Sequence, residues 1–307
     1  MKLTQSITDR IIQAAGEGNV LFHEKMKDHT TMKVGGEAAL FVTPESTDAV
    51  QELVRLLREE QIPYYVLGNG SNVICRDEGY DGVILCLSVK YKGFDIQDTD
   101  SETAEVTVKA GTDNKDFSDA VTERGLSGFE FASGIPGSMG GATCMNAGAY
   151  DGEMKQIIKE VKILDGDGNI AVKSNEEMEF GYRHSLASDG KCVILETVLT
   201  LHRDDPEKIR ERVEDLTRRR EEKQPLEYPS CGSTFKRPEG YFAGKLISDA
   251  GLKGFRIGGA QVSEKHAGFV INKEQATAKD VLDLVEHIKK QVLESQGVKL
   301  ECEIRIL

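Results

Sequence analysis

The chain has 307 residues and carries 52 acidic against 39 basic side chains, which gives a formal net charge of −13 at pH 7. Because there is no surplus of lysine and arginine to neutralise phosphates, we do not expect a nucleic-acid partner. With 39% hydrophobic and 30% charged residues, the composition is that of a soluble globular protein, long enough for two or three domains.

The cysteines and the apolar runs indicate a reducing compartment. No C-x-x-C pair occurs, so the cysteines are expected to be free thiols: Cys75, Cys86, Cys144, Cys192, Cys231 and Cys302. Residues 1–18 lack a long apolar core, so no signal peptide is predicted. No run approaches the roughly 20 apolar residues of a membrane span. We therefore expect a cytoplasmic protein with no membrane partner.

Helices and strands alternate over the first 88 residues. The pattern predicts a helix over 4–17, strands at 39–42, 64–67 and 83–87, and a helix capped by Ser46 or Thr47. We interpret this as a βαββ-like domain.

Strands dominate from residue 89 to 205. We expect strands at 105–109, 161–164, 170–172 and 192–201 and a helix at 114–124. The segment Asp165–Asn169 has oxygen side chains at the offsets of a calcium loop, but Ile170 stands where that loop needs glycine. A β-hairpin turn is the favoured interpretation.

The last hundred residues predict a third domain. A charged helix over 205–223 is expected to have Ile209, Val213 and Leu216 as its buried stripe. A short helix at 243–250 and strands at 268–271 and 298–307 are expected. Between those strands, Thr277 and Asp280 form a capping box that opens a long helix. Its buried stripe is predicted to be Val281, Val285, Ile288 and Val292.

Two glycine-rich stretches stand out. Residues 130–152 hold six glycines among small residues, so backbone N–H groups can approach an anion, although ordinary tight turns explain the composition equally well. The second stretch, residues 68–72, is a polar turn after an apolar strand, a common way to present amides to phosphates. Neither is a Rossmann or Walker motif. Together they favour one extended dinucleotide held from two sides.

Motifs in a fixed order then make a resemblance specific. "LGNGSN" and "SGIPGSMGGATCMNAGAYDGE" are followed by "GYRHS", "CGSTFKRPEG" and "LECEIRIL". With these motifs in this order, the chain resembles the UDP-N-acetylenolpyruvoylglucosamine reductase family over nearly its whole length. The resemblance implies an α+β fold of three domains. Residues 1–88 and 89–205 would form a PCMH/vanillyl-alcohol-oxidase-type FAD-binding unit, and residues 206–307 would bind substrate. No long insertion follows Tyr182, which places the chain in the family's shorter class, without the extra substrate-covering loop.

The resemblance also implies the cofactors. These are FAD, expected to be non-covalent because neither glycine-rich stretch contains histidine, and NADPH as co-substrate. The residues expected to contact FAD are Gly68, Asn69, Gly70, Ser71, Asn72, Ser133, Ile135, Pro136, Gly137, Gly140, Gly141, Ala142, Asn146, Gly148 and Ala149.

Three residues are expected to carry the chemistry. Taken alone, Arg183 is an ordinary surface residue and Ser233 a turn-capping hydroxyl. The resemblance implies that Arg183 binds the substrate carboxylate beside the flavin and that Ser233 protonates C2 of the substrate. It implies Glu303, rather than Glu301 two residues earlier, as the carboxylate that helps to polarise the substrate.

The implied reaction is the reduction of UDP-N-acetylglucosamine enolpyruvate to UDP-N-acetylmuramate in peptidoglycan synthesis. Arg237 stands where many relatives have asparagine, so its contact to the UDP moiety is an open point. No metal site is expected, because the histidines form no ligand pattern, and we expect a monomer. Two rivals stay open: another FAD oxidoreductase of the same fold, and a non-enzymatic flavin-binding module. The expected substrate contacts are Tyr150, Tyr182, Lys236, Arg237, Gln261 and His266.

Overall fold

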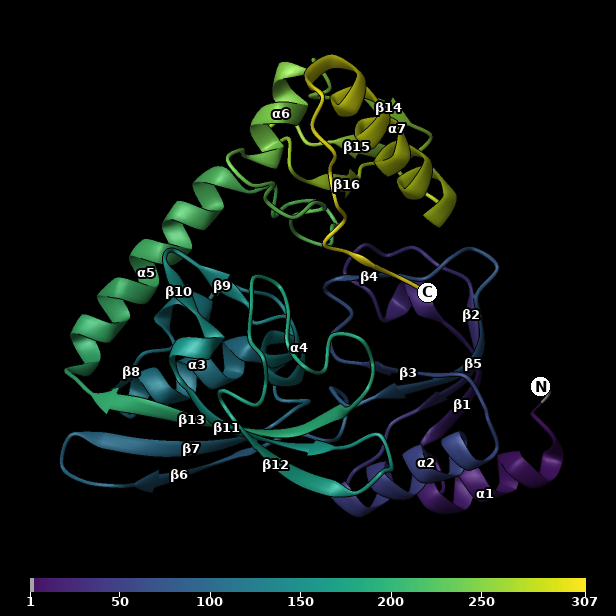
Figure 1. Cartoon of the computed structure of the whole chain (residues 1–307), viewed down its shortest axis with the longest axis vertical. Coiled ribbons are helices and arrows are strands. Elements are labelled where there is room, and N and C mark those ends of the chain that lie inside the picture. Colours follow the sequence, from purple (N-terminus) through teal and green to yellow (C-terminus); the bar gives the residue numbers. More distant parts are fainter. Residues whose placement is uncertain (1–2) are drawn as a thin grey trace. The chain divides into compact units, whose positions relative to one another are not determined.

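The computed structural model describes residues 3–307 as a mixed α and β chain (Figure 1). The chain forms two compact units, each assembled from separate stretches of sequence. Unit 1 holds the described residues up to Phe22 together with Leu40–Asn69 and Gly82–Arg219. Unit 2 holds His23–Ala39, Gly70–Asp81 and Arg220–Leu307. The two units therefore alternate along the first 88 residues, and the predicted division into three consecutive domains stays a prediction.

A six-stranded antiparallel sheet forms much of unit 1. Its strand order is β12-β11-β13-β7-β6, and the short β8 also pairs with β13. Leu164 pairs with Ile170 at the end of the β11–β12 ladder, which confirms the predicted hairpin turn at 165–169. The strands are β6 (Phe94–Asp98), β7 (Thr103–Lys109), β8 (Leu126–Ser127), β11 (Ile158–Leu164), β12 (Ile170–Ser174) and β13 (Val193–Arg203).

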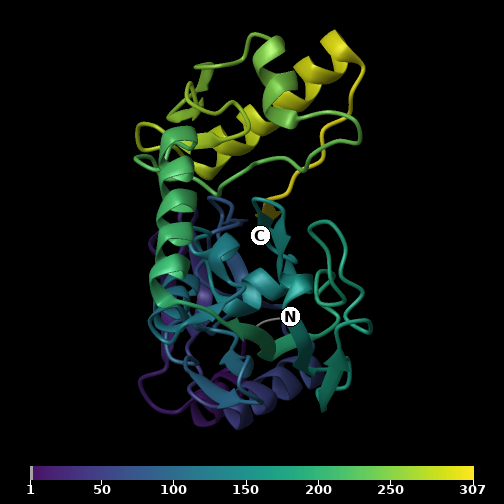
Figure 2. The ribbon, with the colours of Figure 1, turned by 90° about the vertical axis from the view of Figure 1, so that its left-hand side faces the viewer.

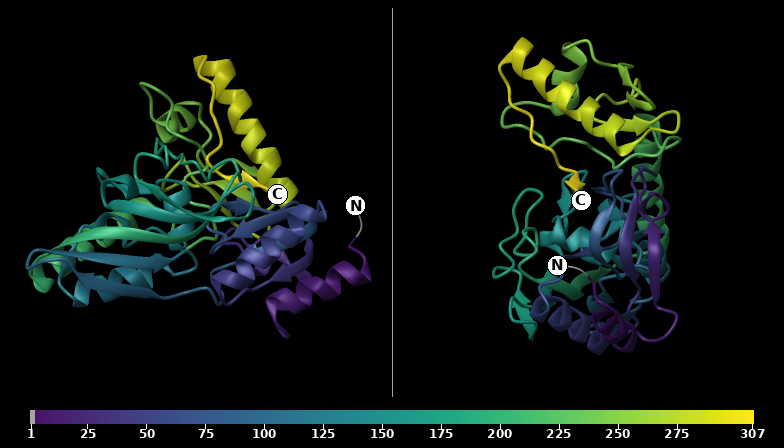
Figure 3. Two further views of the ribbon diagram at one scale, coloured as in Figure 1. Left: turned by 60° about the horizontal axis from the view of Figure 1, so that its bottom comes forward. Right: turned by 90° about the vertical axis from the view of Figure 1, so that its right-hand side faces the viewer.

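A second sheet has four strands in the order β1-β2-β5-β3, with β3 and β5 parallel. Helices α1 (Gln5–Ala15) and α2 (Thr47–Glu59) lie side by side, as the left view of Figure 3 shows. Ser46 is the cap of α2, because its Oγ accepts a hydrogen bond from the amide of Ala49 at 3.1 Å. The strands are β1 (Val20–Lys25), β2 (Glu37–Val42), β3 (Tyr64–Leu67) and β5 (Tyr80–Cys86).

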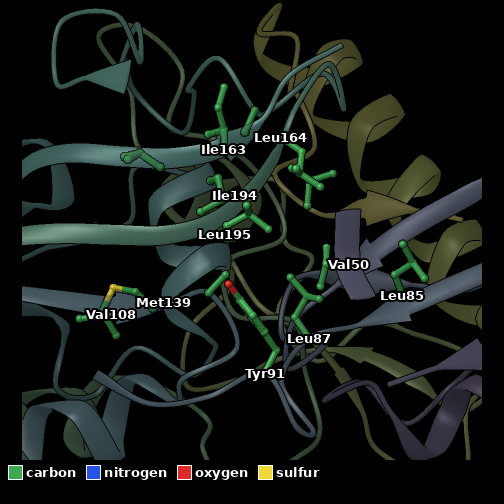
Figure 4. Close-up of a cluster of buried hydrophobic side chains, with 14 of the residues drawn as sticks. Val50, Leu85, Leu87, Tyr91, Val108, Met139, Ile163, Leu164, Ile194 and Leu195 are labelled. Atoms are coloured by element: carbon green, nitrogen blue, oxygen red, sulfur yellow. The ribbon is translucent and has the colours of Figure 1, made fainter. Parts of the chain in front are cut away.

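The core of unit 1 gathers apolar side chains from both α2 and the long strands (Figure 4). Tyr91 is fully buried among them, and its hydroxyl meets Oγ1 of Thr47 at 2.8 Å. The buried polar group is thus satisfied, as a stable core requires. Strand β7 alternates buried and half-buried residues along its length, which is why its period-2 pattern could be predicted.

Unit 2 is built around helix α7 (Ala278–Gln296), with α6 (Ala243–Asp249) beside it (Figure 2). The predicted capping box is confirmed: Oγ1 of Thr277 accepts from the amide of Asp280 at 3.0 Å, and the Asp280 carboxylate accepts from the amide of Thr277 at 3.0 Å. All four residues of the predicted stripe are buried. The remaining strands of unit 2 are β4 (Val73–Ile74), β14 (Arg256–Ile257), β15 (Ala260–Val262), β16 (Val270–Asn272) and β17 (Arg305–Ile306).

Two expectations are wrong in part. The terminal strand predicted over 298–307 is limited to β17, which pairs in parallel with β4. The residues before it make only an isolated bridge, from Cys302 to Phe235. Helix α5 (Pro206–Lys223) forms as predicted, but only Ile209 of its stripe is buried, while Val213 and Leu216 are half-buried. Within residues 3–307, no helix is both long and apolar enough to cross a membrane.

Candidate functional site

The two glycine-rich stretches meet within unit 1. Gly68 follows β3 and lies so close to Ser138 that a Cβ on Gly68 would stand 2.1 Å from the serine Oγ. Beside it, the side-chain amide of Asn69 donates to the carboxylate of Asp113 at 2.6 Å. Asp113 in turn forms a β-bridge with Ser138 and caps helix α3 (Asn114–Glu123). The first turn is therefore fixed against the start of the second stretch.

The second half of the first turn belongs to unit 2. Gly70 has φ of +62°, and a Cβ there would lie 2.0 Å from the main-chain oxygen of His29, so only glycine fits. The amide of Thr31 donates to the oxygen of Gly70 at 3.2 Å. Further along, the side-chain amide of Asn72 donates to the main-chain oxygen of Glu303 at 3.1 Å. Residues 70–72 are thus anchored to two other segments of unit 2.

Helix α4 (Met139–Cys144) lies at the centre of the second stretch. Its two glycines differ in whether the surrounding protein leaves space for a side chain. A Cβ on Gly140 would stand 2.7 Å from the Cβ of Ala110, so packing alone excludes a side chain there. Gly141 is exposed, and a Cβ on it would meet only the Oγ of Ser138, at 3.5 Å. Nothing in the protein requires glycine at 141, which leaves room there for the close approach of a ligand.

Two buried polar atoms in or beside this stretch have no hydrogen-bond partner among residues 3–307. They are the Oγ of Ser133 and the Oδ1 of Asn114, whose side chain is 1% exposed. The Asn114 amide nitrogen donates to the main-chain oxygen of Ile135 at 3.3 Å, which aligns the side chain along the loop. An unsatisfied buried polar atom costs about 1–3 kcal/mol. A polar cofactor bound along this loop would satisfy both atoms, so the residues present fit such a group.

Asn114 was not among the predicted cofactor contacts. In the sequence it is one polar residue in the first turn of a helix, where asparagine is common. Its burial against the loop depends on the contact between α3 and residues 135–137, which no local pattern specifies.

Arg183 lies on a tight turn held against the second stretch. The turn is closed by two main-chain hydrogen bonds between Gly181 and His184, at 3.0 and 3.2 Å. Nη2 of Arg183 donates to the main-chain oxygen of Gly148 at 3.1 Å, and the guanidinium carbon lies 5.1 Å from the ring centre of Tyr182. The expected catalytic arginine is thus brought to the same loop as the expected flavin contacts.

Ser233 and Glu303 lie on neighbouring extended segments of unit 2. The amide of Glu303 donates to the oxygen of Thr234 at 2.9 Å, and the amide of Lys236 donates to the oxygen of Glu301 at 2.9 Å. This pairing places Glu303 opposite the residue that follows Ser233. Glu303 is half-buried, whereas the Glu301 side chain is 69% exposed and faces Lys236 Nζ at 3.9 Å. The different exposure supports Glu303 over Glu301.

The other expected substrate contacts fall into two groups. Arg237 is exposed, with its guanidinium carbon 4.0 Å from the ring centre of Phe242. Gln261 is 8% exposed on β15, and its amide donates to the main-chain oxygen of Gly254 at 3.0 Å. Nδ1 of His266 accepts from the main-chain amide of Gly268 at 3.1 Å, and burial lowers the pKa of His266. Gln261 and His266 each make a hydrogen bond within unit 2, and their contact with substrate stays a prediction.

Two protein-family models match the sequence of this chain, and both matches agree with the site described above. Residues 38–173 match the family model described as an FAD binding domain, and residues 224–307 match the one described as UDP-N-acetylenolpyruvoylglucosamine reductase, C-terminal domain. The fold and the glycine-bounded site define an FAD-dependent oxidoreductase with a PCMH-type FAD-binding unit and a C-terminal domain.

The relatives make the assignment specific. A UDP-N-acetylenolpyruvoylglucosamine reductase of Clostridium perfringens (strain SM101) is 50% identical over 291 residues, which are 95% of this chain and 94% of that one. The enzyme of the same name from Caldanaerobacter subterraneus is 45% identical over 305 residues, which are 99% of each chain. The chain belongs to the UDP-N-acetylenolpyruvoylglucosamine reductase family.

Solved structures agree. The crystal structure of UDP-N-acetylenolpyruvylglucosamine reductase from Thermus caldophilus matches with a TM-score of 0.79 and 36% identity, over 94% of this chain and 97% of that one. An alkyldihydroxyacetonephosphate synthase matches with a TM-score of 0.52 and 16% identity, over 66% of this chain and 41% of that one. At that identity the second match shows a shared fold alone.

Proposed function

We propose that this chain reduces UDP-N-acetylglucosamine enolpyruvate to UDP-N-acetylmuramate, with NADPH as the source of hydride, in the synthesis of a peptidoglycan precursor. The observation that carries the proposal is the pairing of residues 234–236 with 301–303, which sets Glu303 beside the Ser233 turn. The pairing joins the main chains of the two segments, one of which carries a hydroxyl and the other a carboxylate, and both groups are suited to proton transfer. A flavin-binding module without enzymatic activity would have no use for them.

Each side chain has one task in this reaction. FAD, when bound, would supply the redox chemistry that links NADPH to C3 of the enolpyruvyl group. As the C3–H bond forms, the C2=C3 electron pair moves toward the substrate carboxylate. Arg183 provides a permanent cation with paired N–H donors for that carboxylate, and Glu303 helps to polarise the enolpyruvyl group. Ser233 donates its proton to C2, which forms the C2–H bond, and recovers a proton from water.

The residues that would hold FAD are those of the two glycine-rich stretches. Gly141 leaves space for the cofactor, and Ser133 and Asn114 offer polar atoms that lack protein partners. Neither stretch contains histidine, which supports a non-covalent flavin. Heat denaturation should therefore release all of the flavin into the supernatant.

The UDP moiety is assigned to the segment that follows Ser233. Lys236 and Arg237 are the cations of this segment, and both lie within five residues of the serine. A pair of cations suits a diphosphate. Replacing Arg237 with asparagine, the residue many relatives have, should preserve turnover. Replacing it with glutamate should raise KM for the UDP-sugar with little change in kcat.

The test of the proposed activity is a coupled measurement of NADPH oxidation and product mass. With FAD-loaded protein and UDP-N-acetylglucosamine enolpyruvate, we expect NADPH consumption and UDP-N-acetylmuramate formation in equal amounts. NADPH consumption that is the same with and without the enolpyruvate, and that depends only on oxygen, would overturn the substrate assignment.

A further inference from the structure

Five residues without the freedom of glycine adopt left-handed backbone conformations around the Arg183 turn. They are Asn146, Tyr150, Asp151, Glu179 and Arg183, with φ values of +40°, +51°, +65°, +52° and +54°. Each such residue costs on the order of 1–3 kcal/mol and persists only where the surrounding contacts hold it. Because these residues are concentrated in one small region, contacts within that region must hold their backbone conformations.

The side chain of Asn146 makes three hydrogen bonds within this region. It is 1% exposed, and its amide nitrogen donates to Oε2 of Glu153 and to the main-chain oxygen of Gly181, both at 3.0 Å. Its Oδ1 accepts from the amide of Lys155 at 2.9 Å. Both amide protons and one oxygen lone pair are therefore committed to the protein. Little of this side chain is left to bind a cofactor, which is the role predicted from the sequence.

These bonds join the Arg183 turn to the hairpin that Arg183 itself contacts. The hairpin consists of β9 (Gly148–Ala149) and β10 (Gly152–Glu153). Asn146 fixes the start of the turn through Gly181, and buried Ser185 fixes its end, because its Oγ donates to the main-chain oxygen of Cys144 at 2.7 Å. The guanidinium is held between these two anchors by its bond to Gly148.

We infer that Asn146 is a positioning residue that fixes the direction of the Arg183 guanidinium. Without its amide, the turn loses its connection to Glu153 and the left-handed conformation of Arg183 loses one of its supports. Arg183 then samples several directions, and the interaction with a substrate carboxylate weakens. The link to catalysis depends on the proposed function, whereas the link between Asn146 and the Arg183 turn does not.

The variant that isolates this role is Asn146→Gly. Glycine adopts the left-handed backbone without strain, so the substitution removes the amide and spares the fold. Asn146→Asp is the second variant. It keeps the shape and the acceptor for Lys155 but loses both donors, and it covers the case in which the glycine variant does not fold.

The matched control is Asn175→Gly. The Asn175 amide also donates to two protein oxygens, the main-chain oxygens of Lys155 and Ile158, at 2.8 and 2.6 Å. Neither bond reaches the Arg183 turn. The control therefore removes a comparable pair of hydrogen bonds from the same neighbourhood.

The first readout needs no catalytic activity: the rate of tryptic cleavage after Arg183, followed by mass spectrometry of the folded protein. We expect cleavage after Arg183 to rise about tenfold in the Asn146 variants, the effect of losing about 1.4 kcal/mol of hydrogen bonding. Cleavage after Arg218, on exposed α5, should not change. Wild-type cleavage rates after Arg183 in both Asn146 variants, or an equal rise in the Asn175 control, would overturn the inference.

The second readout separates the two half-reactions by stopped flow. In the Asn146 variants we expect flavin reduction by NADPH at close to the wild-type rate and reoxidation by the enolpyruvate at least about tenfold slower, for the same loss of 1.4 kcal/mol. If wild-type protein does not turn over the enolpyruvate at all, the proposed function fails, and the cleavage readout still decides the role of Asn146. Equal slowing of both half-reactions would mean that Asn146 serves general stability and not Arg183.

Discussion

The side-chain amide of Asn72 donates a hydrogen bond to the main-chain oxygen of Glu303 at 3.1 Å. The main-chain oxygen of Asn72 also accepts from the amide of Arg305 at 2.9 Å. Both bonds lie within unit 2 and tie the end of the first glycine turn to the C-terminal segment. A residue predicted from its motif as a cofactor contact is therefore also an anchor for the expected catalytic glutamate.

Replacing Asn72 with alanine should slow the reoxidation of reduced flavin by the enolpyruvate about fivefold, because one hydrogen bond of about 1 kcal/mol no longer holds Glu303 in register. The control is Asn272→Ala, which removes a similar bond, from the Asn272 side-chain amide to the main-chain oxygen of Met32 at 3.1 Å, and also the bond that Oδ1 accepts from the amide of Ala276 at 2.8 Å. We expect the control to lower the melting temperature and to leave reoxidation unchanged. An N72A enzyme with wild-type reoxidation would refute the anchoring role.

Replacing Gly141 with alanine should separate folding from cofactor binding. Gly141 lies within α4 with open space around it, so alanine should stabilise the FAD-free protein by up to about 1 kcal/mol through helix propensity. The new methyl group should weaken FAD binding at least about tenfold if the cofactor lies against this position. Thermal melting of the FAD-free protein and flavin titration measure the two effects. Gly140→Ala, which clashes with Ala110, should destabilise even the FAD-free protein. Wild-type FAD affinity in G141A would contradict the proposed cofactor path.

Replacing Ser233 with alanine should leave flavin reduction by NADPH unchanged and slow reoxidation by the substrate by about two to four orders of magnitude, the usual contribution of a positioned acid. Stopped-flow absorbance of the flavin measures both steps. Ser248→Ala, on the neighbouring helix α6, serves as the control and should behave as wild type. If S233A turns over normally, Ser233 is not the proton donor.

The stability of the protein should fall as the pH rises above about 9. Burial raises the pKa of Cys231 to about 12 and the pKa values of Cys75 and Cys192 to about 11. Below pH 9 these thiols are protonated in both states and contribute no pH dependence. Above pH 9 the unfolded chain loses protons that the folded chain keeps, so each thiol lowers the free energy of unfolding by about 1.4 kcal/mol per pH unit until its folded pKa is reached.

Urea unfolding between pH 7 and 11 measures this slope, and Cys231→Ala should flatten it by the share of one thiol. The Cys231 Sγ donates to the main-chain oxygen of Val73 at 3.5 Å, an interaction that exists only while the thiol is protonated. A slope that is the same with and without Cys231 would show that this thiol ionises equally in both states.

Local chemistry explains which parts of the fold the sequence predicts well. The capping box at Thr277 and the turn at 165–169 depend on residues within five positions of one another, and both were predicted correctly. The close approach of Gly68 to Ser138 joins two loops that are far apart in the sequence. It agrees with the inference, drawn from the glycines of the two loops, that both hold one ligand.

The remaining features depend on contacts that no local pattern specifies. Residues 70–81 join unit 2 through partners such as Arg305, more than 200 positions away. The pairing of 301–303 with 234–236 is irregular, so the alternating pattern of the C-terminus predicted a longer strand than the one that forms. The buried amides of Asn114 and Asn146 acquire their roles only from the loops that fold over them.

The measurement that tests the central claim most directly is the visible spectrum of the FAD-loaded protein under anaerobic conditions, during two additions. NADPH is added first, and UDP-N-acetylglucosamine enolpyruvate follows. The account predicts that the flavin band bleaches on the first addition and returns on the second, with UDP-N-acetylmuramate as the product. A band that bleaches and does not return would show that the protein reduces some other acceptor, and would contradict the proposed function.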